Sequence, residues 1–145
     1  MLCLQCFCSF TTNVVSWSPD AIKDTNDVQI TCDSTKGNRG LYNYKDSVYV
    51  HVGLVTDLNG SATTWQYLKF TWGSSVASAK AHGAGENKWS YSIHNIRNFF
   101  DVPSDERILK VAILFRSGNC QDSCYALRNE DGSDIFIPVN DVHFP

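Results

Sequence analysis

Short stretches of alternating apolar and polar residues run through most of this chain, and residues that favour turns separate them. The stretch 48–55 is the strongest, because its valines fall on one face of an extended chain while Tyr49 and His51 fall on the other. Such alternation is typical of a half-buried β-strand. The pattern predicts strands over 13–17, 28–32, 48–55, 65–72, 88–93, 107–116, 124–127 and 135–139.

Four segments refine this prediction. In 65–72, alternation places Trp65, Tyr67 and Lys69 on the face opposite Leu68, Phe70 and Trp72. The stretch 107–116 is almost continuously apolar, which predicts a central strand covered on both faces. Residues 74–86 are small and polar and are expected to form a loop. The stretch 95–102 predicts the one helix, capped by Asn95 and stopped by Pro103.

Many short strands separated by turns predict an all-β sandwich. Length and composition agree, because 145 residues with a hydrophobic share of 43% suffice for one folded domain. A net charge of −3 without a basic run argues against a nucleic-acid partner. No stretch approaches the roughly 18 apolar residues of a membrane span. We expect Trp72 and Trp89 in the core, since a sandwich usually buries one or two tryptophans.

The N-terminus and the cysteines bear on localisation. Residues 1–12 begin with an apolar stretch and precede the first basic residue, Lys23, so we interpret them as a signal remnant or a disordered end before a module over 13–145. This favours a secreted or cell-surface protein. Cys120 and Cys124 flank a short loop that could bring them within disulfide range, the alternative being two free thiols in a reducing cell. The remaining cysteines are Cys3, Cys6, Cys8 and Cys32, and they form no matched zinc motif.

Six segments carry a resemblance to a known family: 33–40 (DSTKGNRG), 48–51 (VYVH), 65–72 (WQYLKFTW), 95–100 (NIRNFF), 113–118 (ILFRSG) and 131–138 (DGSDIFIP). Their order resembles the immunoglobulin-like N-terminal module of secreted bacterial glycosidases of the α-amylase type, a module similar in layout to starch-binding modules. The resemblance spans 14–139. It departs from the family where the chain ends before a catalytic barrel, which suggests a fragment or an isolated module, and where Cys120 and Cys124 replace a Gly-rich turn.

The resemblance implies an immunoglobulin-like β-sandwich of seven to eight strands with one short helix. It also implies a non-catalytic module that binds starch-like α-glucans beside an amylase-type catalytic domain. Its sugar platform would comprise His51, Trp65 and Tyr67, with Lys69 at the edge, because flat rings stack on the apolar faces of glucose. In the alternative, Trp65 and Tyr67 pack under a loop, and the module is a spacer or docking domain that binds no sugar.

The sequence features that could indicate a metal site or an active site are weaker than those for the sugar platform. Residues 129–134 are rich in oxygen ligands, which would make Asp131 and Asp134 the ligands of a calcium ion. The stretch lacks a full calcium loop, however, and Asp-Gly is a common hairpin turn, so we expect no metal and no cofactor. The acidic residues show no pairing across a cleft, and no GxSxG motif is present, so we do not expect an enzyme.

Overall fold

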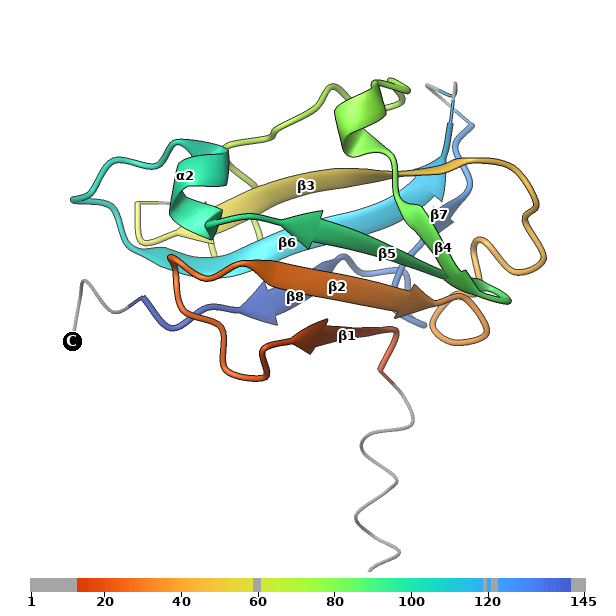
Figure 1. Ribbon diagram of the computed structural model, residues 1–145, viewed down its shortest axis with the longest axis horizontal. Helices are drawn as coiled ribbons and strands as arrows, with labels where there is room; N and C mark the ends of the chain where they lie inside the picture. Colours follow the sequence, from red (N-terminus) through yellow and green to blue (C-terminus); the bar gives the residue numbers. More distant parts are fainter. Residues whose placement is uncertain (1–12, 59–60, 119, 121–122, 142–145) are drawn as a thin grey trace, which may run out of the picture.

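The computed structural model describes residues 13–58, 61–118, 120 and 123–141, which form two antiparallel sheets packed face to face (Figure 1). The first sheet has the order β1–β2–β5–β4, and its strands are β1 (Val15–Ser18), β2 (Val28–Asp33), β5 (Lys88–Ile93) and β4 (His82–Gly85). One short helix, α2 (Ile96–Phe100), follows β5. The predicted fold class, an all-β sandwich of seven to eight strands with a short helix, is confirmed.

The second sheet is built around its longest strand. Its members are β3 (Val48–Thr56), β6 (Ile108–Ser117), β7 (Ala126–Leu127) and β8 (Ile135–Pro138). The strand β6 pairs with β3 along one edge, and β8 and then β7 occupy successive parts of its other edge. This arrangement makes β6 the central strand, as its apolar sequence predicts.

The core lies between the two sheets. In β3 the valines at 48, 50 and 52 are buried, and they face alternate residues of β2 and β5 such as Ile30 and Ile93. From β6, the side chains of Val111, Ile113 and Phe115 complete this layer. Burial of these apolar side chains is the main contribution to the stability of such a fold. The period-two pattern therefore fixes which face of each strand is internal.

The outer face of the β3–β6 sheet is covered as well. Every residue of β6 from Val111 to Ser117 is buried, although alternate residues point away from the core. On this outer face His51 pairs with Leu114, and Gly53 pairs with Ala112. The cover is the segment 65–73, which lies along β3 and folds over its face. The prediction that the strand at 107–116 is covered on both sides is confirmed.

The prediction of a strand over 65–72, with two alternating faces, is wrong. The segment meets β3 in one isolated bridge, in which Leu54 and Gln66 exchange backbone hydrogen bonds of 2.7 Å, and in a single further bond of 3.1 Å from the Lys69 N–H to the Val52 carbonyl. Tyr67 has a φ of 56°, in the left-handed region, and this interrupts an extended chain. The alternating rings contact two different surfaces, since Trp65 and Trp72 lie against His51 while Tyr67 and Phe70 pack against the core. The alternation therefore does not require a strand ladder.

Other expectations need smaller corrections. The expected loop at 74–86 contains a 3₁₀ turn, η1 (Ala77–Ala79), and the exposed edge strand β4. Asn95 caps α2 as predicted, because its side chain accepts a hydrogen bond of 3.2 Å from the Asn98 backbone, but the helix ends at Phe100. Trp89 is half-buried and packs against the core. Trp72 is not in the core, because it lies against His51 and Arg116 on the outer face.

Candidate functional site

A shallow depression of about 300 Å³ lies on the outer face of the β3–β6 sheet. It is lined by His51 of β3, Leu114 of β6, three residues of the covering segment (Trp65, Leu68 and Trp72), and Arg128 and Asp134 from the connection between β7 and β8. The depression therefore joins segments that are far apart in the sequence. It also contains two of the predicted platform residues, His51 and Trp65.

Three aromatic rings form the apolar part of the depression. The rings of His51 and Trp65 are stacked, with centroids 5.4 Å apart and planes inclined by 27°. Trp72 meets the His51 ring edge-on at 5.1 Å. All three rings are half-buried, and Leu68 beside them is 53% exposed. The rings are thus held by one another while part of their surface remains open to solvent.

Gly53 allows the covering segment to approach the sheet. A Cβ atom at this position would lie 2.9 Å from the Gln66 carbonyl oxygen, 3.0 Å from Leu68 Cδ2 and 3.3 Å from Trp65 Cε3. A side chain of any size would push the segment outward. Glycine within a strand often marks such a close approach of other backbone. The glycine in the middle of this strand is therefore a feature of the sequence that could have indicated that 65–68 folds over β3.

A polar group borders the rings on one side. Trp65 Nε1 donates a hydrogen bond of 3.0 Å to one oxygen of Asp134, and Arg128 Nη1 donates to the other. The side chains of Arg128 and Asp134 are 32% and 31% exposed. The Arg128 backbone N–H donates to Asn38 Oδ1 at 2.9 Å, which fixes the residue to a neighbouring loop. Asp134 is therefore held as an acceptor of two hydrogen bonds beside the ring of Trp65.

A fully buried guanidinium lies beneath Trp72. Arg116 donates to the backbone carbonyls of Ser117, at 2.7 Å, and Ser74, and its charge lies over the rings of Tyr49 and Trp72. Burial lowers the pKa of His51, and the charge of Arg116 lowers it further. The His51 ring is therefore neutral at pH 7 and presents an aromatic surface rather than a cation.

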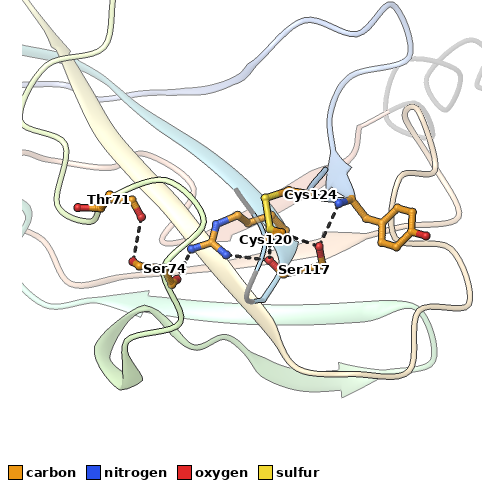
Figure 2. The surroundings of a disulfide bond; sticks show 7 residues. Thr71, Ser74, Ser117, Cys120 and Cys124 are labelled. Carbon is orange, nitrogen blue, oxygen red and sulfur yellow. Dashed lines mark hydrogen bonds between the residues drawn. A yellow bond between two sulfur atoms is a disulfide. The ribbon is translucent and has the colours of Figure 1, made fainter. Parts of the chain in front are cut away.

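A disulfide braces the end of β6 next to this arginine (Figure 2). Cys120 and Cys124 are joined, with Cα atoms 5.0 Å apart. Ser117 Oγ donates to Cys120 Sγ at 3.7 Å and accepts from the Tyr125 backbone at 3.0 Å. Figure 2 also shows Ser74, which donates to the Thr71 carbonyl at 2.9 Å. The segment that carries Trp72 and the disulfide loop are thus linked through Arg116.

The other two predicted platform residues have different partners. The Tyr67 hydroxyl donates to the buried carboxylate of Glu106, and its ring packs against the core. Lys69 Nζ donates to the Phe99 carbonyl at 2.7 Å and lies over the Phe99 ring. Neither residue lines the depression. The structure brings His51 and Trp65 together, and it directs Tyr67 and Lys69 toward α2 and the loop that follows it.

The predicted calcium ligands have protein partners. Asp131 accepts hydrogen bonds from the Ser133 backbone at 3.0 Å and its hydroxyl at 2.6 Å, and these bonds lower the pKa of the carboxyl group. Asp134 is engaged by Trp65 and Arg128. Within the described part of the chain, no group of three or more His, Cys, Asp or Glu side chains is placed to hold a metal ion.

The chain matches no protein-family model and no curated protein. None of the described helices has the length and apolar character needed to cross a membrane. The signal-like residues 1–12, with Cys3, Cys6 and Cys8, lie outside the described residues. Among the described cysteines, Cys32 is buried and unpaired, and burial raises the pKa of its thiol to about 12.

Proposed function

We propose that this protein is a non-catalytic carbohydrate-binding module for starch-like α-glucans, secreted or at the cell surface, that works beside an amylase-type catalytic domain. The observation that carries the proposal is the partly exposed Trp65 ring, stacked on neutral His51 and bonded to Asp134. The family resemblance of the sequence supports the choice of an α-glucan.

The chemistry of a sugar suits this arrangement. A pyranose ring presents apolar C–H patches on its faces and hydroxyl groups at its edges. The depression offers rings for the faces, and it offers the Arg128–Asp134 pair for the hydroxyls. Because the depression is shallow and open, a polysaccharide chain could cross it without a free end entering a cavity. Such a surface favours a polymer over an enclosed small molecule.

The mechanism would be avidity rather than chemistry. A module that holds the polymer keeps further bonds of the same chain near a linked catalytic site, so it raises their effective concentration. Weak binding at one surface is sufficient for this effect. The rigid outer face supports it, because ordered rings lose little conformational entropy when a sugar binds.

Affinity electrophoresis in gels with and without soluble starch tests the proposal, with pullulan, a cellulose derivative and xylan as controls. We expect starch to retard the protein selectively and Trp65→Ala to abolish the retardation. Tyr125→Ala is the matched control, because Tyr125 is 63% exposed but lies outside the depression. Absence of retardation of the wild-type protein in every gel would refute the proposal.

A docking or spacer domain is the second candidate. The observation that favours it is Leu68, an aliphatic side chain that is 53% exposed in the depression. Exposed apolar side chains next to half-buried tryptophans are typical of protein contacts. In that case Leu68→Ser would weaken association with an amylase-type catalytic domain, and starch would retard neither protein.

A further inference from the structure

We propose that Arg128 sets the linkage specificity of this site by binding two adjacent hydroxyl groups of one neutral hexose residue. The inference rests on the proposed function and deepens it. It assigns the site to glucans in which O2 and O3 of the same residue are both free. Every residue within a chain linked 1→4 meets this condition, whereas in a chain linked 1→3 each residue except the one at the non-reducing end uses O3 in the linkage itself.

The first argument is the unused part of the guanidinium. Arg128 Nη1 donates to Asp134, whereas Nε and Nη2 have no hydrogen-bond partner within the described part of the chain. These two nitrogens form one edge of a planar group, with parallel donors that match two acceptors side by side. Arg128 lines the depression and is 32% exposed, so this edge remains accessible to a ligand.

The second argument is that the residue is already ordered. The Arg128 backbone is bonded to Asn38 Oδ1 at 2.9 Å, and Asn38 Nδ2 donates in turn to the Ala126 carbonyl at 3.1 Å. The side chain is fixed at its other end by Asp134, which also accepts from Trp65. A ligand would therefore bind without first ordering a long side chain, which removes a usual cost of binding through arginine.

The third argument concerns the charge of the ligand. Asp134 is an acceptor, and an ionised carboxylate offers about four lone-pair sites, of which Trp65 and Arg128 use two. A hydroxyl group can accept from Arg128 and donate to Asp134 at the same time. A uronate carboxylate cannot donate, and it would stand beside Asp134 with a like charge. The pair therefore favours a neutral sugar over an acidic one.

Calorimetric titration with three tetrasaccharides tests the inference: maltotetraose (α-1,4), an α-1,3-linked glucotetraose methylated at O3 of its non-reducing end, and a tetragalacturonate. We expect the wild-type protein to bind maltotetraose about tenfold or more tightly than the α-1,3-linked compound, because no residue of that compound has both O2 and O3 free and a charged donor is left unpaired. Arg128→Gln and Arg128→Lys should both abolish this preference. The lysine variant is decisive, because it keeps the charge next to Asp134 but loses the paired donors.

Arg107→Gln is the matched control, since it removes one arginine outside the depression and should keep the preference. Wild-type preference in Arg128→Lys, or tighter binding of the tetragalacturonate by the wild-type protein, would overturn the inference. The two proposals fail differently. If the wild-type protein binds neither neutral tetrasaccharide, the proposed function fails. If Trp65→Ala abolishes maltotetraose binding and the Arg128 variants keep the linkage preference, only the role of Arg128 fails.

Discussion

Arg116 shows how a single charge can be buried in this fold. It is fully buried on β6, and it forms no ion pair with any carboxylate of the described residues. Its positive charge is balanced by the carbonyl groups of Ser74 and Ser117 and by the faces of two aromatic rings. Because Ser74 directly follows the covering segment and Ser117 belongs to β6, the two hydrogen bonds of the guanidinium connect the end of this segment to the strand.

Substitutions of Arg116 should distinguish the stabilising effect of its two hydrogen bonds from the effect of its charge. Arg116→Met removes both hydrogen bonds and the buried charge, and we expect the free energy of unfolding to fall by about 1–3 kcal/mol. Arg116→Lys keeps the charge on a single nitrogen that cannot serve both carbonyls, so its loss should be larger. Urea unfolding followed by tryptophan fluorescence measures both. A lysine variant as stable as the wild-type protein would contradict this account.

Tyr67 gives the protein a predictable response to alkaline pH. Burial, and then its bond to Glu106, raises the pKa of Tyr67 from 10 to about 12. The folded protein holds this proton more tightly than the unfolded chain does. Its contribution to stability is thus complete below pH 10 and is lost as the pH rises from 10 toward 12.

The variant Tyr67→Phe should therefore lose less stability over the same pH range, because it carries no proton at this position. Urea unfolding at several pH values between 9 and 11 measures the difference. Burial also raises the pKa values of Tyr44 and Tyr91, but these residues are present in both proteins and cancel in the comparison. Equal pH dependence of the two proteins would show that the Tyr67 proton is not linked to folding.

At the scale of elements, the sequence predicts strands that have one apolar face. The strands β2, β3, β5 and β6 follow from period-two alternation or from a continuous apolar run. The exposed strand β4 escapes prediction, because its residues His-Gly-Ala-Gly carry no apolar pattern. The segment 65–72 is overpredicted for the opposite reason. Its rings alternate in the sequence, but Trp65 and Trp72 lie against His51 on the outer face of the sheet, whereas Tyr67 and Phe70 pack against the core.

The site was predictable only in part. A ring on β3 and the first aromatic residue of the next segment could be paired from the sequence, and His51 and Trp65 do stack. Trp72 and Arg128 were missed, because their positions depend on how distant connections fold over β6. The sequence predicts Asp134 only as a possible calcium ligand, because its bond to Trp65 spans 69 positions in the sequence and has no local signal.

Gly53 provides a test of how the covering segment is held. In Gly53→Ala the new Cβ would meet the Gln66 backbone oxygen at 2.9 Å, so the segment must move away from β3. We expect the free energy of unfolding to fall by about 1–3 kcal/mol and starch retardation to weaken, because Trp65 moves with the segment.

Gly83→Ala is the matched control for this substitution. Gly83 lies in β4, and nothing would lie within 4 Å of an added Cβ. The free energy of unfolding of the Gly83→Ala variant should be unchanged or should rise by up to about 1 kcal/mol, since alanine restricts the unfolded chain. Urea unfolding and affinity electrophoresis measure both variants. A similar effect at the two positions would mean that close packing at Gly53 does not position the segment.

At the scale of the whole molecule, one buried arginine joins four parts of the chain. Arg97 of α2 donates to Asp24, between β1 and β2, at 2.9 Å, and to Asp141, after β8, at 2.5 Å. Its other nitrogen, Nη1, donates to the carbonyls of Pro103 and Glu106, in the connection between α2 and β6. Both sheets and the helix therefore meet at a single guanidinium.

Removal of this guanidinium should be the most damaging of the substitutions considered. In Arg97→Met, Asp24 and Asp141 would keep their buried negative charges without the cation they share, and loss of one member of a buried ion pair costs about 3–5 kcal/mol. Arg128→Met removes an arginine from a partly exposed pair, and such pairs contribute about 0–1 kcal/mol. Urea unfolding of both variants compares the two pairs directly. Similar losses of unfolding free energy in the two variants would show that the sandwich is held by its apolar core alone. A large loss confined to Arg97→Met would identify this cluster as the polar junction of the two sheets.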